Sequence, residues 1–339
     1  MAQKPTIEDI ARLAEVSRGT VSRVLNNHPA VSDDTRARVL DVIEQLNYSP
    51  NYSARHMRTE TSNMVGFETD EVSTTPYAVD IIRGAQEALR QHGKVLLVIS
   101  AGYDFETTQS SLEVLIERRV EGIIYATMFH REVELPPQMS RLPTVLANCY
   151  AKNRDLPSVV PDEISGGYNA ARALLEQGHK RIAFINLDRA YGTPIAPTPA
   201  AIGRLIGFRR AHAEFGLEFD ESLLLYTDQR PQTNHEFTLE LMRRPNPPTA
   251  IFCGNDRTAV GCFSGLMSLG LRIPDDVAVV GFDNQTDICE AMYPRLTSVQ
   301  LPHYAMGRWA AEYLLSARNG SPSPVPQQIE CDLIPRQSI

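Results

Sequence analysis

Short apolar runs alternate with helical patterns through most of the chain, and this alternation restricts the fold more than any other feature. The expected strands are residues 64–67, 95–99, 122–126, 181–185, 249–252 and 277–281, and the expected helices are residues 76–92, 107–117, 165–177, 200–215 and 256–269. Strands that alternate with helices of this length indicate parallel, doubly wound sheets of the α/β class. Because the alternation stops and then restarts, we expect two lobes.

The composition is that of an ordinary globular protein. The 339 residues, of which 42% are hydrophobic and 22% charged, suffice for two or three domains. No stretch reaches the ~18 apolar residues of a membrane span, and residues 1–12 lack the apolar core of a secretion signal. We therefore expect a cytoplasmic protein without a membrane partner. The five cysteines form no C-x-x-C pair, and no G-x-G-x-x-G or Walker pattern follows an expected strand, so we expect neither a metal nor a cofactor.

Two short helical patterns separated by a tight turn occupy residues 6–26. Thr6 suits a helix N-cap, and Asp9 three positions later completes an approximate capping box. Apolar residues at helical spacing end before Ser17, which offers a second N-cap after a turn of about three to four residues. A third amphipathic pattern follows at residues 32–46. We therefore expect an all-α helix-turn-helix head in front of the α/β domain.

The periodicity of these helices predicts which side chains face inward. The expected inward residues are Ile10, Ala11 and Ala14 in the first helix, Val21, Val24 and Leu25 in the second, and Ala37, Leu40 and Ile43 in the third. On the outer face of the second helix lie Arg18 and Arg23, and arginine to guanine is the commonest specific contact to a DNA base. A helical hairpin with a charged, solvated face is the alternative interpretation.

Residues 6–26 resemble, at nearly every position, the N-terminal signature of the lactose-repressor (LacI/GalR) type of bacterial transcription regulator. That signature reads roughly T-I-x-D-I/V-A-x-x-A-G-V-S-x-x-T-V-S-R-V-L-N, and this chain departs from it at Glu15, where glycine is usual. The turn there often needs a left-handed residue, which costs a non-glycine side chain roughly 1–2 kcal/mol. We expect slight local strain at Glu15 and no change of fold.

The resemblance implies how the head contacts DNA. Arg18 and Arg23 would read base edges, and Gly19 would allow close approach. Polar side chains would position the head on phosphates, and they are Thr6, Ser17, Thr20, Ser22, Asn26 and Ser32. The net charge of −8 is unfavourable for DNA binding, and residues 1–60 hold eight basic and eight acidic side chains. We therefore expect modest non-specific affinity, with specificity resting on a few arginines and on dimerisation.

Residues 48–62 form a linker behind the head, residues 1–47. Its helix-capable part, residues 52–58, is far shorter than the ~12–15 residues that stabilise an isolated helix in water, so a plain flexible linker is one interpretation. The resemblance implies the other: a hinge helix that pairs with its dimer mate and inserts a side chain into the minor groove. Asn51, Ala54 and Met57 match that motif, although leucine is usual at Met57. A long apolar side chain such as methionine can still open a base step.

Residues 63–339 resemble the periplasmic-binding-protein-like effector domain of the same family, which binds sugars between two lobes. Ligands of such folds lie at the carboxyl ends of the strands. By resemblance, Arg204, Asn255 and Asp283 are the best effector contacts. Carboxylate, amide and guanidinium groups suit paired sugar hydroxyls because they hold fixed hydrogen-bonding geometry.

Three further residues are weaker candidates for the effector site. Asp256 also follows an expected strand, and Asp162 lies in Pro161-Asp162-Glu163; for each the alternative is a helix cap or a surface carboxylate. Tyr77, near the start of the first helix of the α/β domain, offers a ring that can stack on a sugar and donate a hydrogen bond.

The leading hypothesis is a homodimeric transcription regulator, a repressor of carbohydrate genes, that binds a pseudo-palindromic operator in double-stranded DNA. A small-molecule effector, a mono- or disaccharide, would control it from the cleft. The alternatives are a sugar-processing enzyme or a sugar-binding protein that uses the same cleft. Asp162 and Asp283 would be the acid and base of such an enzyme. No G-x-S-x-G or H-E-x-x-H motif supports catalysis.

Overall fold

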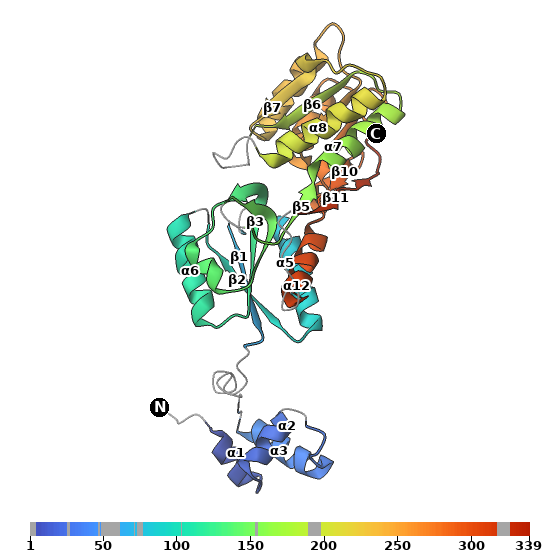
Figure 1. The fold of residues 1–339 in the computed structure, drawn as a ribbon. Coiled ribbons are helices and arrows are strands. Elements are labelled where there is room, and N and C mark those ends of the chain that lie inside the picture. The colour runs from blue at the N-terminus through green and yellow to red at the C-terminus, as the bar shows by residue number, and fades with distance from the viewer. Residues whose placement is uncertain are drawn as a thin grey trace. The chain divides into compact units, whose positions relative to one another are not determined.

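The computed structural model describes residues 5–25, 28–46, 48, 62–70, 72, 77–102 (backbone only at 77 and 78), 104–152, 155–188, 198–316 and 326–339. The chain divides into two compact units, Met1–Ser62 and Asn63–Ile339. Across the described ranges, no helix combines the length and the apolarity needed to cross a membrane. Figure 1 labels the elements of both units.

The N-terminal unit contains three helices, α1 (Ile7–Leu13), α2 (Arg18–Leu25) and α3 (Asp33–Gln45). The capping box at α1 is confirmed, since the Asp9 amide donates to Thr6 Oγ1 at 3.3 Å and the Thr6 amide donates to Asp9 Oδ2 at 2.9 Å. The predicted second cap is also confirmed: Ser17 Oγ accepts from the Thr20 amide at 3.1 Å. These caps satisfy amides that a helix start leaves without an intrahelical partner.

The three helices pack around a small apolar core. Its buried residues are Ile10, Ala11, Ala14, Val21, Val24, Val39 and Val42. The faces predicted for the first two helices are confirmed. In the third, Ile43 packs on the core as predicted, but the prediction is wrong for Ala37 and Leu40, which are exposed. Helix α3 carries apolar side chains on two adjacent faces, and its packing on α1 and α2 selects the face of Val39 and Val42.

Glu15 lies in the turn between α1 and α2 with a φ of 52°. The left-handed conformation expected there is therefore present with a glutamate in place of glycine. The turn still closes, since the Val16 amide donates to the carbonyl of Ala11 at 2.9 Å. Glutamate in place of glycine raises the conformational energy of this turn and leaves the fold unchanged.

The first lobe of the C-terminal unit, lobe 1, is a parallel sheet with strand order β11-β5-β4-β3-β1-β2. Its strands are β1 (Met64–Thr69), β2 (Val95–Ser100), β3 (Ile123–Val133), β4 (Thr144–Ala151), β5 (Ser158–Asp162) and β11 (Gln327–Glu330). Its helices are α5 (Tyr77–Gln91), α6 (Phe105–Glu117), α12 (His303–Ser316) and the 3₁₀ turn η1 (Pro137–Arg141). One apolar cluster joins the sheet to α5 and α12, and another joins the opposite face to α6 (Figure 1).

The second lobe, lobe 2, has strand order β12-β10-β9-β8-β6-β7, and all pairs are parallel except β10 with β12. Its strands are β6 (Ile182–Leu187), β7 (Leu224–Thr227), β8 (Ala250–Cys253), β9 (Ala278–Asp283), β10 (Thr297–Gln300) and β12 (Leu333–Ile334). Its helices are α7 (Glu163–Glu176), α8 (Pro199–Glu214), η2 (Glu221–Leu223), α9 (Pro231–Met242), α10 (Asp256–Ser268) and α11 (Thr286–Cys289). The predicted α/β class with two doubly wound lobes is confirmed.

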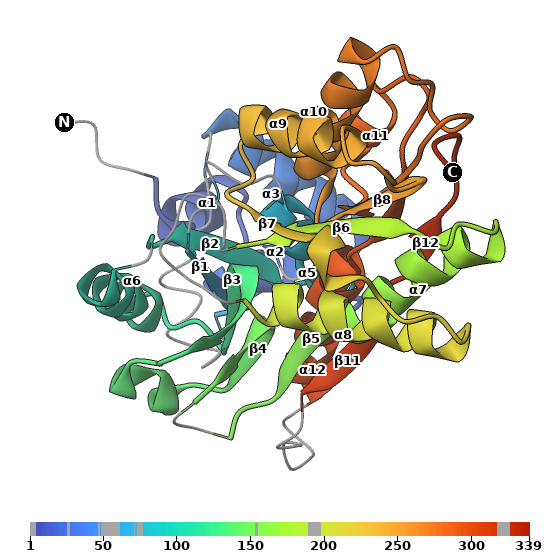
Figure 2. The same cartoon turned by 90° about the horizontal axis from the view of Figure 1, so that it is seen from above.

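The chain crosses between the lobes three times. It leaves lobe 1 between β5 and α7, returns between β10 and α12, and leaves again between β11 and β12. Figure 1 shows β5 and β11 where the two lobes meet, and Figure 2 shows the same elements from above. The alternation in the sequence indicated two lobes but not that α12 and β11 return to the first one. Such returns depend on tertiary pairing, which local periodicity does not encode.

Glycines allow a pair of helices in each lobe to pack with their backbones in close contact. A Cβ atom at Gly84 in α5 would overlap the carbonyl oxygen of Tyr304 in α12. In lobe 2 a Cβ atom at Gly207 in α8 would overlap the carbonyl oxygen of Ile164 in α7. No side chain fits at either position unless the helices separate.

Candidate effector site and DNA-reading head

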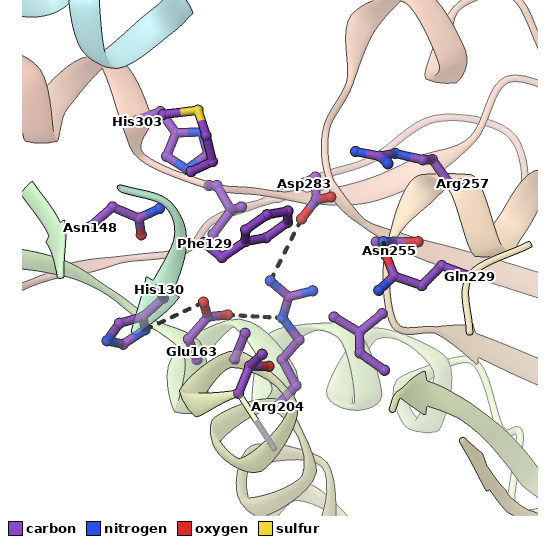
Figure 3. A pocket seen from close by; sticks show the side chains of 15 residues that line it. Phe129, His130, Asn148, Glu163, Arg204, Gln229, Asn255, Arg257, Asp283 and His303 are labelled. Atoms are coloured by element: carbon purple, nitrogen blue, oxygen red, sulfur yellow. Dashed lines mark hydrogen bonds and ion pairs between the residues drawn. The ribbon is translucent and has the colours of Figure 1, made fainter. Parts of the chain in front are cut away.

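A pocket lies between the two lobes, lined by residues that follow or end the strands (Figure 3). Its volume is about 50 Å³. Pockets that enclose small ligands usually measure roughly 300–1,000 Å³. A sugar therefore fits only if the lobes open or the polar side chains in the pocket rearrange.

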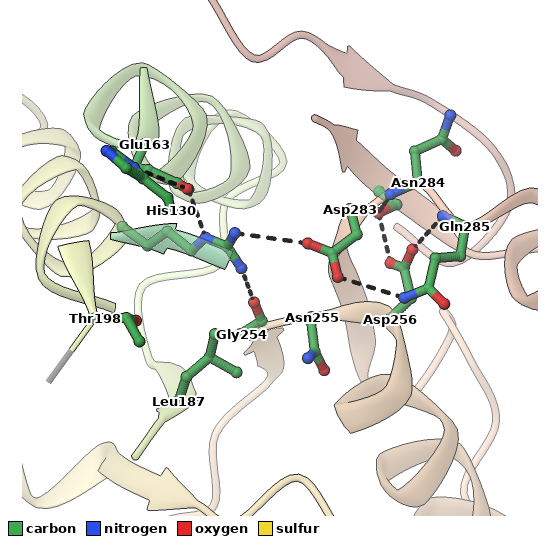
Figure 4. Close-up of polar contacts among 12 residues, drawn as sticks. His130, Glu163, Leu187, Thr198, Gly254, Asn255, Asp256, Asp283, Asn284 and Gln285 are labelled. Carbon is green, nitrogen blue, oxygen red and sulfur yellow. Dashed lines mark hydrogen bonds and ion pairs between the residues drawn. The ribbon is translucent and has the colours of Figure 1, made fainter. Parts of the chain in front are cut away.

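Arg204 of α8 lies at the centre of this pocket, and its side chain is 3% exposed. Its Nε donates to Glu163 Oε2 at 2.8 Å, a second nitrogen donates to the carbonyl of Gly254, and a third lies 3.6 Å from Asp283 Oδ1 (Figure 4). The guanidinium also stacks 3.6 Å from the centre of the Phe282 ring. The structure thus brings together Arg204 and Asp283, two residues that the sequence placed in the effector site.

The close packing of α7 on α8 explains why Arg204 reaches Glu163. A Cβ atom at Gly167 in α7 would overlap the backbone of Arg204, and a Cβ atom at Gly203 in α8 would lie 2.6 Å from that of Glu163. Two glycines therefore let the arginine-bearing turn of α8 lie directly against the first turn of α7. The ion pair follows from this backbone proximity.

Asn255, the third candidate, also lines the pocket and caps α10. Its Oδ1 accepts from the Thr258 amide at 2.9 Å, and its Nδ2 donates to Gln229 Oε1 at 2.7 Å. Gln229, which sequence reasoning did not select, lines the pocket as well and is 3% exposed. The two amides form one hydrogen-bonded unit in this wall.

Asp162 and Asp256 do not line the pocket. Asp162 caps α7, accepting from the amides of Ile164 at 3.1 Å and Ser165 at 2.9 Å, which is the helix-cap alternative left open by the sequence. Asp256 is fully buried and holds a turn behind the pocket wall. The side chain of Tyr77 lies outside the described residues.

The wall contributed by lobe 1 is an irregular segment of β3. The register between β3 and β4 shifts between Ala126 and Arg131, and the residues of this shift that line the pocket are Met128, Phe129 and His130. The Met128 amide donates to Asp70 Oδ1 at 2.9 Å, and Arg131 forms an ion pair with Asp70 at 3.1 Å. A buried carboxylate thus fixes the backbone of this wall.

A second set of hydrogen bonds holds the same segment to β4. Asn148, which lines the pocket with a φ of 59°, donates from Nδ2 to the carbonyl of Thr127 at 2.9 Å. Thr127 Oγ1 lies 2.9 Å from the carbonyl of Asn148 and 2.8 Å from that of Phe129. Reciprocal side-chain bonds of this kind replace the strand bonds that the register shift removes.

Glu163 and His130 are pocket residues that sequence reasoning missed. Burial by itself would raise the pKa of Glu163, but Arg204 and His130 lower it to about 2, so the carboxylate is ionised. His130 Nδ1 of lobe 1 lies 3.7 Å from Glu163 Oε1 of lobe 2. Glu163 stands directly beside the candidate Asp162, so the sequence analysis selected the wrong one of two neighbouring carboxylates.

His303, at the start of α12, completes the polar lining. Burial lowers the pKa of His303 to about 4, so the imidazole is neutral at pH 7. It is 6% exposed and lies close enough to Glu163 and Arg204 to feel their charges. The pocket therefore mixes ionised and neutral hydrogen-bonding groups.

The predicted base-reading residues lie on α2 of the head. Arg18, Gly19 and Arg23 are exposed, as their assignment to the outer face of the helix requires. Arg18 forms an ion pair with Glu8 of α1 at 2.9 Å, and both side chains are more than half exposed. An exposed pair of this kind contributes little stability, so DNA phosphates or bases can replace it at low cost.

The residues predicted to contact phosphates lie at helix starts. Thr6, Ser17 and Ser32 accept hydrogen bonds from amides in the first turns of α1, α2 and α3. Thr20, whose Oγ1 lies 3.0 Å from Ser17 Oγ, and Ser22 belong to α2. Four predicted contacts lie outside the described residues, namely Asn26, Asn51, Ala54 and Met57.

The head and the pocket define a class: one chain joins a helix-turn-helix head to a two-lobed ligand-binding module. Residues 6–51 match the bacterial regulatory proteins of the lacI family, and residues 67–336 match the periplasmic binding proteins and sugar binding domain of the LacI family. The chain belongs to the LacI family of bacterial regulatory proteins. It is a DNA-binding transcription regulator, which confirms the resemblance seen in the sequence.

Three similar proteins cover nearly the whole chain. The NTD biosynthesis operon regulator NtdR of Bacillus subtilis is 32% identical over 94% of this chain and 94% of that protein. The sucrose operon repressor of Escherichia coli is 33% identical over 96% of this chain and 99% of that repressor. Among solved structures, a complex of the transcriptional regulator CelR with cellobiose is 31% identical, with a TM-score of 0.66, and covers 98% of this chain and 99% of that one.

Proposed function

We propose that this regulator represses carbohydrate genes in the cytoplasm by binding a pseudo-palindromic operator as a homodimer. A mono- or disaccharide in the pocket controls its affinity for that operator. Residues 1–47 serve as the head, residues 48–62 as the hinge and residues 63–339 as the effector domain. The single observation that carries this proposal is the convergence of Arg204, Asn255 and Asp283 on one buried polar pocket between the lobes.

The chemistry of the pocket supports a sugar as effector. Carboxylate, amide and guanidinium groups surround it, and Phe129 and Leu301 add apolar surface that suits the faces of a sugar ring. Two similar proteins agree with this class, since one is a sucrose operon repressor and another was solved with cellobiose.

Sugar processing is the weaker proposal. The acid–base pair considered for an enzyme was Asp162 with Asp283, but Asp162 caps α7 and does not line the pocket. Asp283 Oδ1 lies 3.6 Å from a nitrogen of Arg204, so this carboxylate is part of an ion pair. The relatives are transcription regulators as well. We therefore propose that the bound sugar is a signal and not a substrate.

Selection of operators from a random double-stranded DNA library, with and without a pool of mono- and disaccharides, tests the whole proposal. We expect a two-fold symmetric motif whose enrichment changes when sugars are added. A symmetric motif that ignores every sugar would overturn the effector assignment. Absence of a symmetric motif under both conditions would overturn the dimeric DNA-binding assignment.

Alanine at Arg18 tests the reading helix. Loss of a bidentate contact to guanine should weaken operator binding by about 1–3 kcal/mol and relax the preference at one base pair in each half-site. Competition assays with operators altered at each position measure both effects. An equal loss on every sequence would assign Arg18 to phosphates instead.

A further inference from the structure

Glu163 occupies the edge of Arg204 that points toward the first turn of α7. The contact is short, at 2.8 Å, and the two side chains are 4% and 3% exposed. Asp283 approaches another nitrogen of the same guanidinium at 3.6 Å, and the carbonyl of Gly254 accepts from a third. The main cation of the pocket is therefore already surrounded by the protein's own acceptors (Figure 4).

The arginines and the carboxylates of the pocket lining are equal in number. The arginines Arg204 and Arg257 face the carboxylates Glu163 and Asp283 across the same space. The two histidines come from lobe 1 at His130 and from the start of α12, where His303 is neutral at pH 7 because burial lowers its pKa to about 4. Without the Glu163 carboxylate the lining would hold two arginines and one carboxylate, Asp283.

We propose that Glu163 determines the charge class of the effector. By neutralising Arg204, it makes the pocket accept neutral sugars and reject acidic or phosphorylated ones. This inference rests on the proposed sugar-effector function and adds a residue and a selection rule to it. Phosphate and carboxylate groups share the anionic chemistry that the rule excludes.

The physical basis is the cost of an unpaired charge in a buried site. An anionic sugar would either displace Glu163 from Arg204, leaving a buried carboxylate without its cation, or lie beside two carboxylates at short range. A hydroxyl group can donate to Glu163 and accept from Arg204 without breaking the ion pair. The same pair therefore binds neutral ligands and repels anions.

Isothermal titration and thermal unfolding of the full-length protein with matched ligands test the rule. The ligands are glucose, glucuronate and glucose 6-phosphate, a neutral disaccharide panel, and inorganic phosphate, all at one ionic strength. We expect neutral sugars to bind the wild-type protein at least about tenfold more tightly than their acidic counterparts, a difference of about 1.4 kcal/mol. In Glu163→Gln this preference should shrink or reverse, and phosphate should raise the unfolding temperature.

Glu176→Gln is the matched control. Glu176 lies on the same helix and pairs with Arg172 at 2.7 Å, but its side chain is 51% exposed. It should respond to phosphate as the wild-type protein does. The double variant Glu163→Gln/Arg204→Gln should lose the gain in anion binding, which would assign that gain to Arg204. Glu163→Asp has a shorter side chain, which weakens the ion pair without removing its charge. It should show a smaller gain in anion binding than Glu163→Gln, and it replaces Glu163→Gln in the test if that variant does not fold.

The outcomes separate the two proposals. Wild-type protein that binds acidic sugars as tightly as neutral ones overturns the selection rule, and so does an equal response of Glu163→Gln and Glu176→Gln to phosphate. Should no sugar bind any variant while phosphate stabilises Glu163→Gln alone, the role of Glu163 holds and the sugar-effector function fails.

Discussion

The two walls of the pocket are held by two buried aspartates with different electrostatic surroundings. In lobe 1, Asp70 accepts from the Met128 amide and forms an ion pair with Arg131. In lobe 2, Asp256 accepts from the Gln285 amide at 2.6 Å and Ser298 Oγ at 2.6 Å. One wall therefore depends on a cation and the other on neutral donors.

This difference shows in how the second carboxylate titrates. Burial, and then the nearby charge of Asp283, raise the pKa of Asp256 to about 7. The turn that it holds contains Asp283 and Asn284, whose φ values are 102° and 51°, so the turn is strained without that support. Both aspartates hold a backbone segment beside the pocket. The stability of the lobe 1 wall therefore depends on an ion pair, and that of the lobe 2 wall depends on pH.

The largest expected effect is that of Asp70→Asn. The change leaves Arg131, whose side chain is 15% exposed, without the carboxylate that compensates its charge. Breaking a buried pair in this way costs about 3–5 kcal/mol of unfolding free energy. Urea denaturation measures the loss. Asp276→Asn is the control, because its pair with Arg272 is exposed and should change stability by less than about 1 kcal/mol.

The second largest expected effect is the pH dependence of the unfolding free energy that Asp256 causes. Because its pKa is raised from 3.8 to about 7, folding favours the protonated form, so this contribution is fully present below pH 3.8 and is lost as the pH rises through about 7. The slope reaches about 1.4 kcal/mol per pH unit between these values. Asp256→Asn removes it, so the difference in unfolding free energy between variant and wild type should change between pH 5 and 8.

Taking that difference isolates Asp256 from other groups. Burial also raises the pKa of Glu68 to about 7, and Glu68 adds a slope of the same sign in both proteins. Parallel stability curves for the wild type and Asp256→Asn would contradict the titration assigned to Asp256.

The smallest effects come from the hydroxyls beside the two aspartates. Thr127→Val removes the hydroxyl that holds the β3 segment to β4, and Ser298→Ala removes a donor to Asp256. Each should cost about 0.5–1.5 kcal/mol of unfolding free energy.

The loss at Thr127 should be independent of pH, whereas the loss at Ser298 should be larger at pH 8 than at pH 5, because the ionised carboxylate of Asp256 needs the donor more. Denaturation at both pH values compares them, and equal pH profiles would remove the distinction between the walls.

Much of the fold was predictable because its signals are local. The apolar runs at 64–67 and 277–281 lie in β1 and β9, and the caps at Thr6 and Ser17 mark helix starts. The returns of α12 and β11 to lobe 1 were not predictable, since they depend on pairing between distant strands.

The site was predicted in part for a related reason. Arg204, Asn255 and Asp283 line the pocket, whereas Asp162 and its neighbour Glu163 take opposite roles, one as a cap and one as a pocket residue. Asp162 is the N-cap of α7 and Glu163 its first helical residue, and the sequence alone does not decide which of two neighbouring carboxylates caps the helix. His130 was missed because it lies in a register shift of β3, and such shifts leave no periodic signal.

The crossings between the lobes have a mechanical consequence. Glu163, His303 and Cys331 each stand at one crossing, and the charges of Glu163 and Arg204 act on both other residues. The polar contacts of Glu163 and Arg204 therefore lie beside the segments that connect the two lobes. The carboxyl end of β1 lies on the pocket side of lobe 1, since Asp70, which follows it, accepts from the amide of the pocket residue Met128. A rotation of one lobe about the three crossings would therefore displace the opposite, amino end of β1 more than the residues of the pocket.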